Sequence, residues 1–249
     1  MIVLGFDTST PSTTVGLRLS EESARTARHD PAPAEHPGHA TELLPMAAQL
    51  LAEAGVAWSA LDRIAVGVGP GTFTGLRVGI ATARGLAQSL PVELVGVSSL
   101  QALAQGTAVQ DGQERMLAVI DARRGQAFAA AYAVAGRDSI DQLTAPRALA
   151  PEDLGSIAAE AWPASEPNAQ SWLAVGNGAT RFRDHLELAG ALVPPEDSPL
   201  HLVSALSICE LGTHDEASRS YEEILPDYRR NPDAEIALEG AAAAGGPGR

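Results

Sequence analysis

Residues 66–87 read "VGVGPGTFTGLRVGIATARGLA" and hold six glycines in 22 positions. The apolar run "RIAVGVG" (63–69) predicts a buried strand leading into this stretch, and an apolar helical pattern continues to about Ser89. Glycines at such a strand-to-helix turn have two common uses. They open the N–H groups of a helix N-terminus to a phosphate, or they let another segment lie close against the helix.

The spacing of the glycines gives little support to a phosphate-binding loop. Gly69, Gly71 and Gly75 form G-x-G-x-x-x-G, which is neither the dinucleotide-binding fingerprint nor the Walker A motif. All 17 basic residues are arginine, so the chain has no lysine for a P-loop or a Schiff base.

The packing interpretation follows from a row of small residues, since Gly75, Gly79, Ala83 and Ala87 are each four positions apart. Such a row lets a second helix approach almost to backbone contact. The preceding stretch predicts a helix over residues 40–54, ended by Gly55, in which Pro45 has to lie in the first turn. Both helices are apolar on a wide face, which fits either a protein–protein surface or burial in their own lobe. The apolar residues on these faces include Leu43, Leu44, Ala47, Leu50, Leu51 and Leu76.

The order of elements along the chain predicts an α/β fold of two lobes. Residues 2–6, 13–20 and 24–28 predict three strands, and a helix, a strand, a helix and a strand follow, which is the order of a ribonuclease-H-like unit. A similar series starts again at Met116, although sequence repetition between the halves is weak. We therefore expect lobes at residues 1–108 and 109–230, and a disordered tail over 231–249.

Composition limits the classes of function. With 249 residues and 45% apolar content, the chain has enough apolar sequence for a packed core. Its net charge of -14 disfavours a direct RNA-binding role, because nucleic-acid affinity comes mainly from basic groups. The single cysteine, Cys209, excludes an internal disulfide and is expected to be buried. No signal peptide or membrane-spanning run is seen, so we expect a soluble cytoplasmic protein.

Several segments together resemble the TsaB family, also called YeaZ. They are "GPGTFTGLRVGIATARGLA" followed by "GVSSLQALA", "DTST" after the first strand, "HATELLP", "VIDARRGQAFAAAY", "VGNGA" and "PDYRR". The resemblance is collinear over about residues 1–230. It implies two ribonuclease-H-like lobes of the actin/Hsp70/sugar-kinase (ASKHA) superfold.

The resemblance also implies a role without catalysis by this chain alone. TsaB proteins are partners of the catalytic subunit TsaD and, together with the ATPase subunit TsaE, support threonylcarbamoylation of the adenosine next to the tRNA anticodon. It further implies that the two helices form the interface with TsaD, or a homodimer in its absence, and that tRNA is reached only through the complex. The interface residues expected from it are Leu43, Leu44, Ala47, Leu50, Leu51, Gly75, Leu76, Gly79, Ala83 and Ala87.

The superfold makes a nucleotide site between the lobes worth testing on the residues. Asp7 ends the first strand, where an acid near Mg²⁺ would stand, but "DTSTPST" lacks the glycine of a D-x-G-x-T hairpin. We interpret Asp7 as a carboxylate that caps its own turn. Asp7, Thr8, Gly69 and Gly71 are then a vestigial nucleotide site. No cofactor is required, and ATP or ADP with Mg is expected only at a complex interface.

Metal and peptidase chemistry find no matching motif. His36 and His39 in "HPGH" are one residue too close together for the H-x-x-x-H motif, and Pro37-Gly38 prevents a continuous helix there. We therefore predict no metal site. We expect His39 to cap the next helix or to pack against it. Asp121 with Arg123-Arg124 fits either a charged site between the lobes or a strand end followed by a solvated turn, and we favour the second interpretation. A stand-alone ATPase or small-molecule kinase, and a metallopeptidase-like protein, are the alternatives to the partner role.

Overall fold

The first of two β-sheets is built from the N-terminal part of the chain. The computed structural model describes residues 1–32, 35–111, 114–134, 140–163, 172–218 and 220–229. The strands of the first sheet are β1 (Val3–Asp7), β2 (Thr13–Arg18), β3 (Ala24–His29), β4 (Arg63–Gly69) and β5 (Glu93–Ser98), in the order β3-β2-β1-β4-β5. β1, β2 and β3 pair antiparallel, whereas β1, β4 and β5 run parallel. The carboxyl ends of these three parallel strands therefore meet at one edge.

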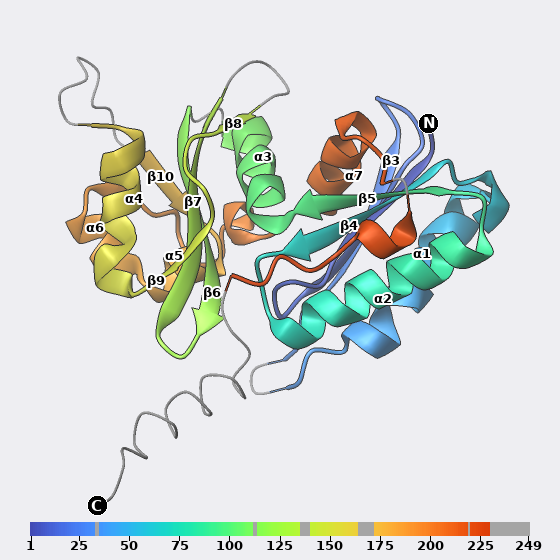
Figure 1. The fold of residues 1–249 in the computed structure, drawn as a ribbon, viewed down its shortest axis with the longest axis horizontal. Coiled ribbons are helices and arrows are strands. Elements are labelled where there is room, and N and C mark those ends of the chain that lie inside the picture. The colour runs from blue at the N-terminus through green and yellow to red at the C-terminus, as the bar shows by residue number, and fades with distance from the viewer. Residues whose placement is uncertain (33–34, 112–113, 135–139, 164–171, 219, 230–249) are drawn as a thin grey trace, which may run out of the picture.

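Two helices cover the outer face of this sheet, as Figure 1 shows. They are α1 (His39–Ala54) and α2 (Phe73–Ser89), with the short 3₁₀ turn η1 (Trp58–Ala60) between them. Leu4 and Phe6 of β1 face outward into the core that these helices close, because alternate residues of a strand point to opposite faces. Pro45 corrects one expectation, since it lies in the second turn of α1, where it cannot donate to the carbonyl of Thr41.

The second sheet repeats the first in its topology. Its strands are β6 (Arg115–Arg123), β7 (Gln126–Val134), β8 (Ile140–Gln142), β9 (Arg147–Leu149), β10 (Trp172–Val175) and β11 (Ala191–Leu192). The order is β11-β10-β6-β7-β8, and β9 also pairs with β7. Two short strands, β8 and β9, thus lie along the same neighbour, β7. The prediction of two ribonuclease-H-like units in an α/β fold is confirmed.

Short helices cover the outer face of the second sheet. They are η2 (Pro151–Asp153), α4 (Leu154–Ala161), α5 (Asn177–Arg181) and α6 (Arg183–Leu188). Leu154, Ile157 and Leu186 close a separate core on Leu117 and Val119 of β6. α5 and α6 follow β10 as two separate helices that meet at Phe182.

The largest core lies between the two sheets. It is filled by α3 (Ser99–Asp111) and α7 (Ala205–His214), with η3 (Pro199–His201) beside them, and Figure 1 shows both helices between the sheets. α7 comes late in the chain but packs on β1 and β2 of the first sheet. Cys209 of α7 is fully buried, as expected, and burial raises the pKa of its thiol to about 12.

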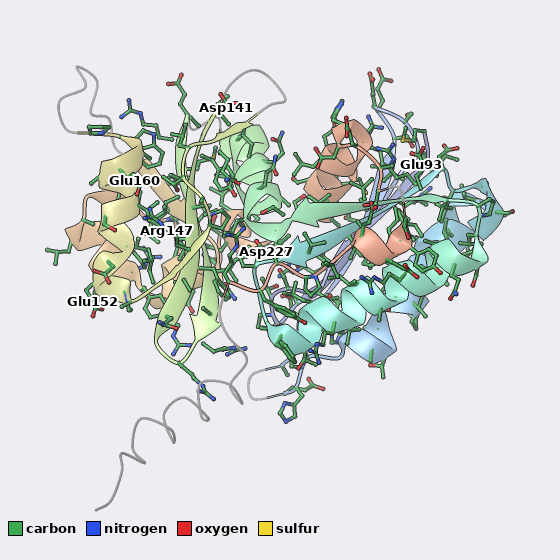
Figure 2. The ribbon with its side chains drawn as sticks, viewed as in Figure 1. Glu93, Asp141, Arg147, Glu152, Glu160 and Asp227 are labelled. Atoms are coloured by element: carbon green, nitrogen blue, oxygen red, sulfur yellow. The ribbon has the colours of Figure 1, made fainter. Side chains whose placement is uncertain are left out.

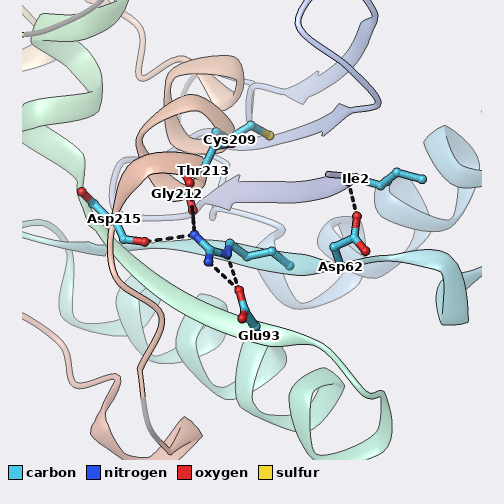
Figure 3. Close-up of polar contacts among 8 residues, drawn as sticks. Ile2, Asp62, Glu93, Cys209, Gly212, Thr213 and Asp215 are labelled. Carbon is cyan, nitrogen blue, oxygen red and sulfur yellow. Dashed lines mark hydrogen bonds and ion pairs between the residues drawn. The ribbon is translucent and has the colours of Figure 1, made fainter.

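Arg63 of β4 binds the carboxyl end of α7, at the place where Figure 3 labels Glu93, Gly212 and Asp215. Its Nη1 donates to the carbonyl oxygens of Gly212 at 2.6 Å and Asp215 at 3.0 Å, and its Nε donates to Glu93 at 2.9 Å. A guanidinium at this position satisfies carbonyl groups that have no partner within the helix and suits the negative end of the helix dipole.

The last described residues form a strap along the first lobe, which we call the C-terminal strap (residues 220–229). It contains η4 (Tyr221–Glu223), and the amide of Asp227 donates to the carbonyl of Val68 at 2.8 Å. Figure 2 shows Asp227 between the two halves of the molecule. Its charge contributes to raising the pKa of Tyr132 in β7, although burial is the larger cause. Figure 1 shows the strap running from the first lobe toward the second sheet.

The structure does not test the expected lobe boundary or the expected disordered tail. α3 runs through the expected boundary at residues 108 and 109, so the division of the chain into two lobes at that point stays a prediction. The expected tail, residues 231–249, lies outside the described residues. Across the part of the chain that the structure describes, no helix is both long and apolar enough to cross a membrane.

Candidate functional site

Asp7 lies at the carboxyl edge of the first sheet and is held by its own chain. Its Oδ1 accepts from the amide of Ser9 at 2.8 Å and from the Ser9 hydroxyl at 2.7 Å. Its Oδ2 accepts from the hydroxyl of Ser99, the first residue of α3, at 2.5 Å. Asp7 is 1% exposed. The interpretation of Asp7 as a turn-capping carboxylate is therefore confirmed, with Ser9 as the residue it caps.

The glycines of α2 lie directly against this turn. A Cβ added at Gly75 would overlap the carbonyl oxygen of Thr8, and one at Gly79 would lie 2.5 Å from the Thr8 hydroxyl oxygen. That hydroxyl donates to the carbonyl of Gly75 at 2.7 Å. One turn earlier, the amide of Thr72 donates to the carbonyl of Ser9 at 2.7 Å. The β1–β2 turn thus packs directly on the first turns of α2, with the Thr8 backbone against Gly75 and the Thr8 side chain against Gly79.

This arrangement corrects the sequence interpretation of the small row. The row was expected to let a helix of another subunit approach, but Gly75 and Gly79 face the Thr8 turn of the same chain. Ala83, the next member, is fully buried in the core of the first lobe. The close approach that the glycines permit is intramolecular, because it joins β1 to α2 across the sheet.

Most residues expected at a partner interface are buried within the chain. Leu44 alone is well exposed, at 45%, and Ala87 is partly exposed. The other eight point into the first lobe and offer no side-chain surface to a partner: Leu43, Ala47, Leu50, Leu51, Gly75, Leu76, Gly79 and Ala83. An interface on α1 and α2 stays a prediction, and it would have to use the exposed neighbours of these residues.

The exposed side of α2 carries an aromatic cluster that sequence reasoning missed. Phe73 at the start of α2 stacks on Tyr228 of the C-terminal strap, with ring centroids 5.2 Å apart. The Arg77 guanidinium lies 3.6 Å from the Phe73 ring centroid, and its Nε donates to the Tyr228 hydroxyl at 2.9 Å. A groove of about 280 Å³ runs beside the cluster, between α2 and the strap. "PDYRR" contained this tyrosine, but nothing in that motif indicates its partner.

The expected vestigial nucleotide site is only partly assembled. Asp7, Thr8 and Gly71 lie together, and a Cβ at Gly71 would be 2.5 Å from the Ser9 Cβ. Gly69 instead faces Leu76, and the Gly69–Pro70 peptide is cis. Asp7 and Thr8 are buried, and their polar atoms bond to the turn and to α2. The edge where a phosphate would meet the helix is filled by the chain itself.

His39 is the first residue of α1 and packs into the lobe. Its Nδ1 lies 2.8 Å from the Thr13 hydroxyl oxygen, and burial lowers its pKa, which the nearby charge of Asp7 partly offsets. His36 is exposed and lies outside the helix. Within the described ranges, no group of three or more His, Cys, Asp or Glu side chains is placed to hold a metal ion.

The second sheet has a counterpart of the Asp7 turn at the same edge. Asp121 near the end of β6 accepts from the amide of Arg123 through Oδ1 at 2.8 Å, as Asp7 accepts from Ser9 two residues on. Its Oδ2 accepts from Arg181 Nη1 at 2.8 Å. The strand-end position expected for Asp121 is confirmed. Its carboxylate is buried and also binds Arg181, a contact that sequence reasoning did not predict.

The family model and the curated relatives that match this chain carry names from the formation of tRNA threonylcarbamoyladenosine. The family model described as TsaD, tRNA N6-adenosine threonylcarbamoyltransferase, matches residues 32–238. The curated "tRNA threonylcarbamoyladenosine biosynthesis protein TsaB" of Escherichia coli is 37% identical over 132 residues, or 53% of this chain and 55% of that protein. The Haemophilus influenzae protein of the same name is 34% identical over 51% of this chain and 52% of its own length. The matched part thus spans about half of these curated relatives.

Solved structures extend the similarity over nearly the whole chain. "YeaZ from Pseudomonas aeruginosa" is 32% identical with a TM-score of 0.72, and the alignment covers 91% of this chain and 99% of that one. A second structure, described as an uncharacterized protein with similarity to peptidase YEAZ from Pseudomonas aeruginosa, is 31% identical with a TM-score of 0.75, and its alignment covers 92% and 99%.

Proposed function

Because the chain belongs to the TsaB/YeaZ family, we propose that it serves in the biosynthesis of tRNA threonylcarbamoyladenosine as a non-catalytic partner of a TsaD-type subunit. In this role it binds the catalytic subunit and holds it in an active state. The subunit it activates modifies the adenosine next to the anticodon.

The observation that carries the non-catalytic role is the filled edge of the first sheet. An enzyme of this superfold needs an acid that can reach Mg²⁺ and a backbone that can approach a phosphate. Asp7 instead accepts three hydrogen bonds from Ser9 and Ser99, the Thr8 hydroxyl donates to the Gly75 carbonyl of α2, and the amide of Thr72 before α2 donates to the Ser9 carbonyl. Binding a nucleotide there would require the β1–β2 turn to leave α2, at the cost of the buried contacts that join them.

The exposed side of α1 and α2 is the surface we assign to the partner. Leu44 on α1 is 45% exposed and Phe73 on α2 is 39% exposed, so each helix offers a large apolar side chain to a partner. The same surface supports a homodimer when the catalytic subunit is absent. TsaE and tRNA join through the complex, and ATP or ADP with Mg would bind only at a junction between subunits.

The experiment measures complex formation by light scattering after size-exclusion chromatography. We expect the wild-type chain and a TsaD protein to form a one-to-one complex, and Leu44→Arg to abolish it while remaining folded, since a buried charge without a partner is costly. Leu188→Arg is the matched control, because Leu188 is 89% exposed on α6 of the other lobe.

Two results would contradict the proposal. A wild-type chain that does not bind a TsaD protein would remove the partner role. A Leu44→Arg variant that binds as tightly as Leu188→Arg would keep the partner role but place the interface elsewhere.

A further inference from the structure

The C-terminal strap is anchored firmly at its start, where Figure 1 shows it as the red segment beside α2. Ile224 is 5% exposed and packs into the core of the first lobe. Arg84 of α2 donates from Nη2 to the carbonyl oxygens of Glu222 at 2.9 Å and Ile224 at 2.6 Å. A buried apolar side chain and two hydrogen bonds from one guanidinium therefore fix the strap as far as Ile224.

The rest of the strap, which we call the distal strap (residues 225–229), is packed much more lightly. None of these described residues is buried, and Leu225 and Tyr228 are 65% and 41% exposed. The ion pair between Arg229 and Asp227, at 2.6 Å, lies within the distal strap and does not attach it to the rest of the chain. A segment with so few buried side chains opens at a lower free energy than the core beneath it.

The attachments that the structure describes for the distal strap are few. The Asp227 amide donates to the Val68 carbonyl at 2.8 Å. The Tyr228 ring stacks on Phe73 with centroids 5.2 Å apart, and its hydroxyl accepts from Arg77 Nε at 2.9 Å. Both contacts of Tyr228 are made to α2, so opening of the distal strap uncovers Phe73 and Arg77.

The surface beneath the distal strap suits a second protein. Phe73 is 39% exposed even with the Tyr228 ring stacked on it, and the Arg77 guanidinium lies 3.6 Å from the Phe73 centroid. The groove of about 280 Å³ between α2 and the strap shows that the strap bridges this surface without filling it. An aromatic ring beside a cation is a typical contact of protein interfaces. Tyr228 already uses both of these groups.

We propose that the distal strap is a displaceable cover of α2, in which Tyr228 competes with the partner protein for Phe73 and Arg77. The inference rests on the proposed function for the identity of that partner, a TsaD-type subunit, whereas the opening of the cover belongs to this chain alone. Because only chains with an open cover offer both groups, the apparent affinity for the partner is the intrinsic affinity multiplied by the open fraction.

Amide hydrogen exchange of the full chain alone, read by NMR, measures the opening. We expect the Asp227 amide to exchange faster than amides in the middle of α2, and about three- to tenfold faster again in Tyr228→Ala. Tyr228→Phe keeps the ring but not the hydrogen bond to Arg77, so its rate should lie between these two. Leu202→Ala is the control, because Leu202 is 40% exposed, nearly as much as Tyr228, but lies outside both the strap and α2.

Binding to a TsaD protein tests the competition. Tyr228→Ala should bind about three- to tenfold more tightly than the wild type, since the open fraction rises. Phe73→Ala removes the ring for which the strap and the partner compete. It should speed exchange of the Asp227 amide as Tyr228→Ala does, but weaken binding. Opposite effects of the two variants on affinity, with the same effect on exchange, identify competition.

Several results would overturn the proposal. One is an Asp227 amide that is protected as well as the middle of α2 in the wild type and in Tyr228→Ala. Another is weaker binding by Tyr228→Ala, which would make Tyr228 part of the partner surface, and a third is an effect of Leu202→Ala as large as that of Tyr228→Ala. If neither the wild type nor Tyr228→Ala binds a TsaD protein, the proposed function fails and the competition with it, while faster exchange at Asp227 in Tyr228→Ala would still show a cover that opens.

Discussion

Gly75 and Gly79 show how single atoms set the geometry of the first lobe. The absence of a Cβ at each lets the Thr8 turn lie on α2, and the Thr8 hydroxyl then bonds to the Gly75 carbonyl at 2.7 Å. Gly85 lies on the same helix, but a Cβ added there meets nothing within 4 Å. Gly75 is therefore constrained by close packing against Thr8, whereas no neighbouring atom constrains Gly85.

This contrast predicts opposite effects for one chemical change. Gly75→Ala should lower the free energy of unfolding by about 2 kcal/mol or more, because the new methyl overlaps the Thr8 backbone and the gain in helix propensity does not offset that. Gly85→Ala should raise it by about 0.5–1 kcal/mol, since only backbone entropy changes. Urea denaturation measures both. Equal stability of the two variants would contradict the packing described at Gly75.

His39 gives the first lobe a pH dependence. Burial lowers the pKa of His39 in the folded state below its ordinary value of about 6.5. The unfolded chain therefore takes up a proton there first as the pH falls, so stability is present above about pH 6.5 and is lost on acidification.

We expect His39→Gln to reduce this loss of stability between pH 7.5 and pH 5.5, about one unit either side of the ordinary histidine pKa. Chemical denaturation at several pH values measures it. His185→Gln, at an exposed position of α6, should keep the wild-type slope. A slope that is the same in the His39 variant and the wild type would assign the acid sensitivity to another group.

At the scale of elements, α7 depends on contacts from distant parts of the chain. Arg63 bonds to the carbonyl of Gly212, 149 residues away, and Arg18 of β2 pairs with Glu210. Close packing completes the attachment, because a Cβ at Gly5 would lie 2.6 Å from Cys209 Sγ. A helix late in the chain thereby becomes part of the first lobe.

Arg63→Met should lower the free energy of unfolding by about 2–4 kcal/mol, since it leaves buried carbonyl groups at the end of α7 without donors. Hydrogen exchange should show the last turns of α7 losing protection first. Arg147→Met, which removes a half-exposed ion pair with Glu160, should change stability by about 0.5 kcal/mol at most. An Arg63 variant as mild as this control would mean that core packing alone holds α7.

At the scale of the whole molecule, two sheets of the same topology share one core. α3 and α7 fill the space between them, and the C-terminal strap runs along the first lobe toward Tyr132 of the second. The repeat extends to details, since both lobes have an Asp-capped turn beside a glycine loop of matching conformation. The carboxyl edges of the two sheets differ in the side chains that cover them, so the two lobes present different chemical groups although their topology is the same.

Local sequence determined the elements of this protein. Alternating and continuous apolar runs predicted the strands, the row of small residues predicted a close approach to α2, and the order of elements predicted two similar lobes, because these features depend on neighbours within a few positions. The tertiary structure decided what those elements meet. Thr8 reaches Gly75 across 67 positions and Arg181 reaches Asp121 across 60. Such contacts depend on how strands pair and helices return to the sheet, which no local pattern specifies. For that reason the glycine row faces its own chain, and the second lobe presents its arginines at the edge that the first lobe closes.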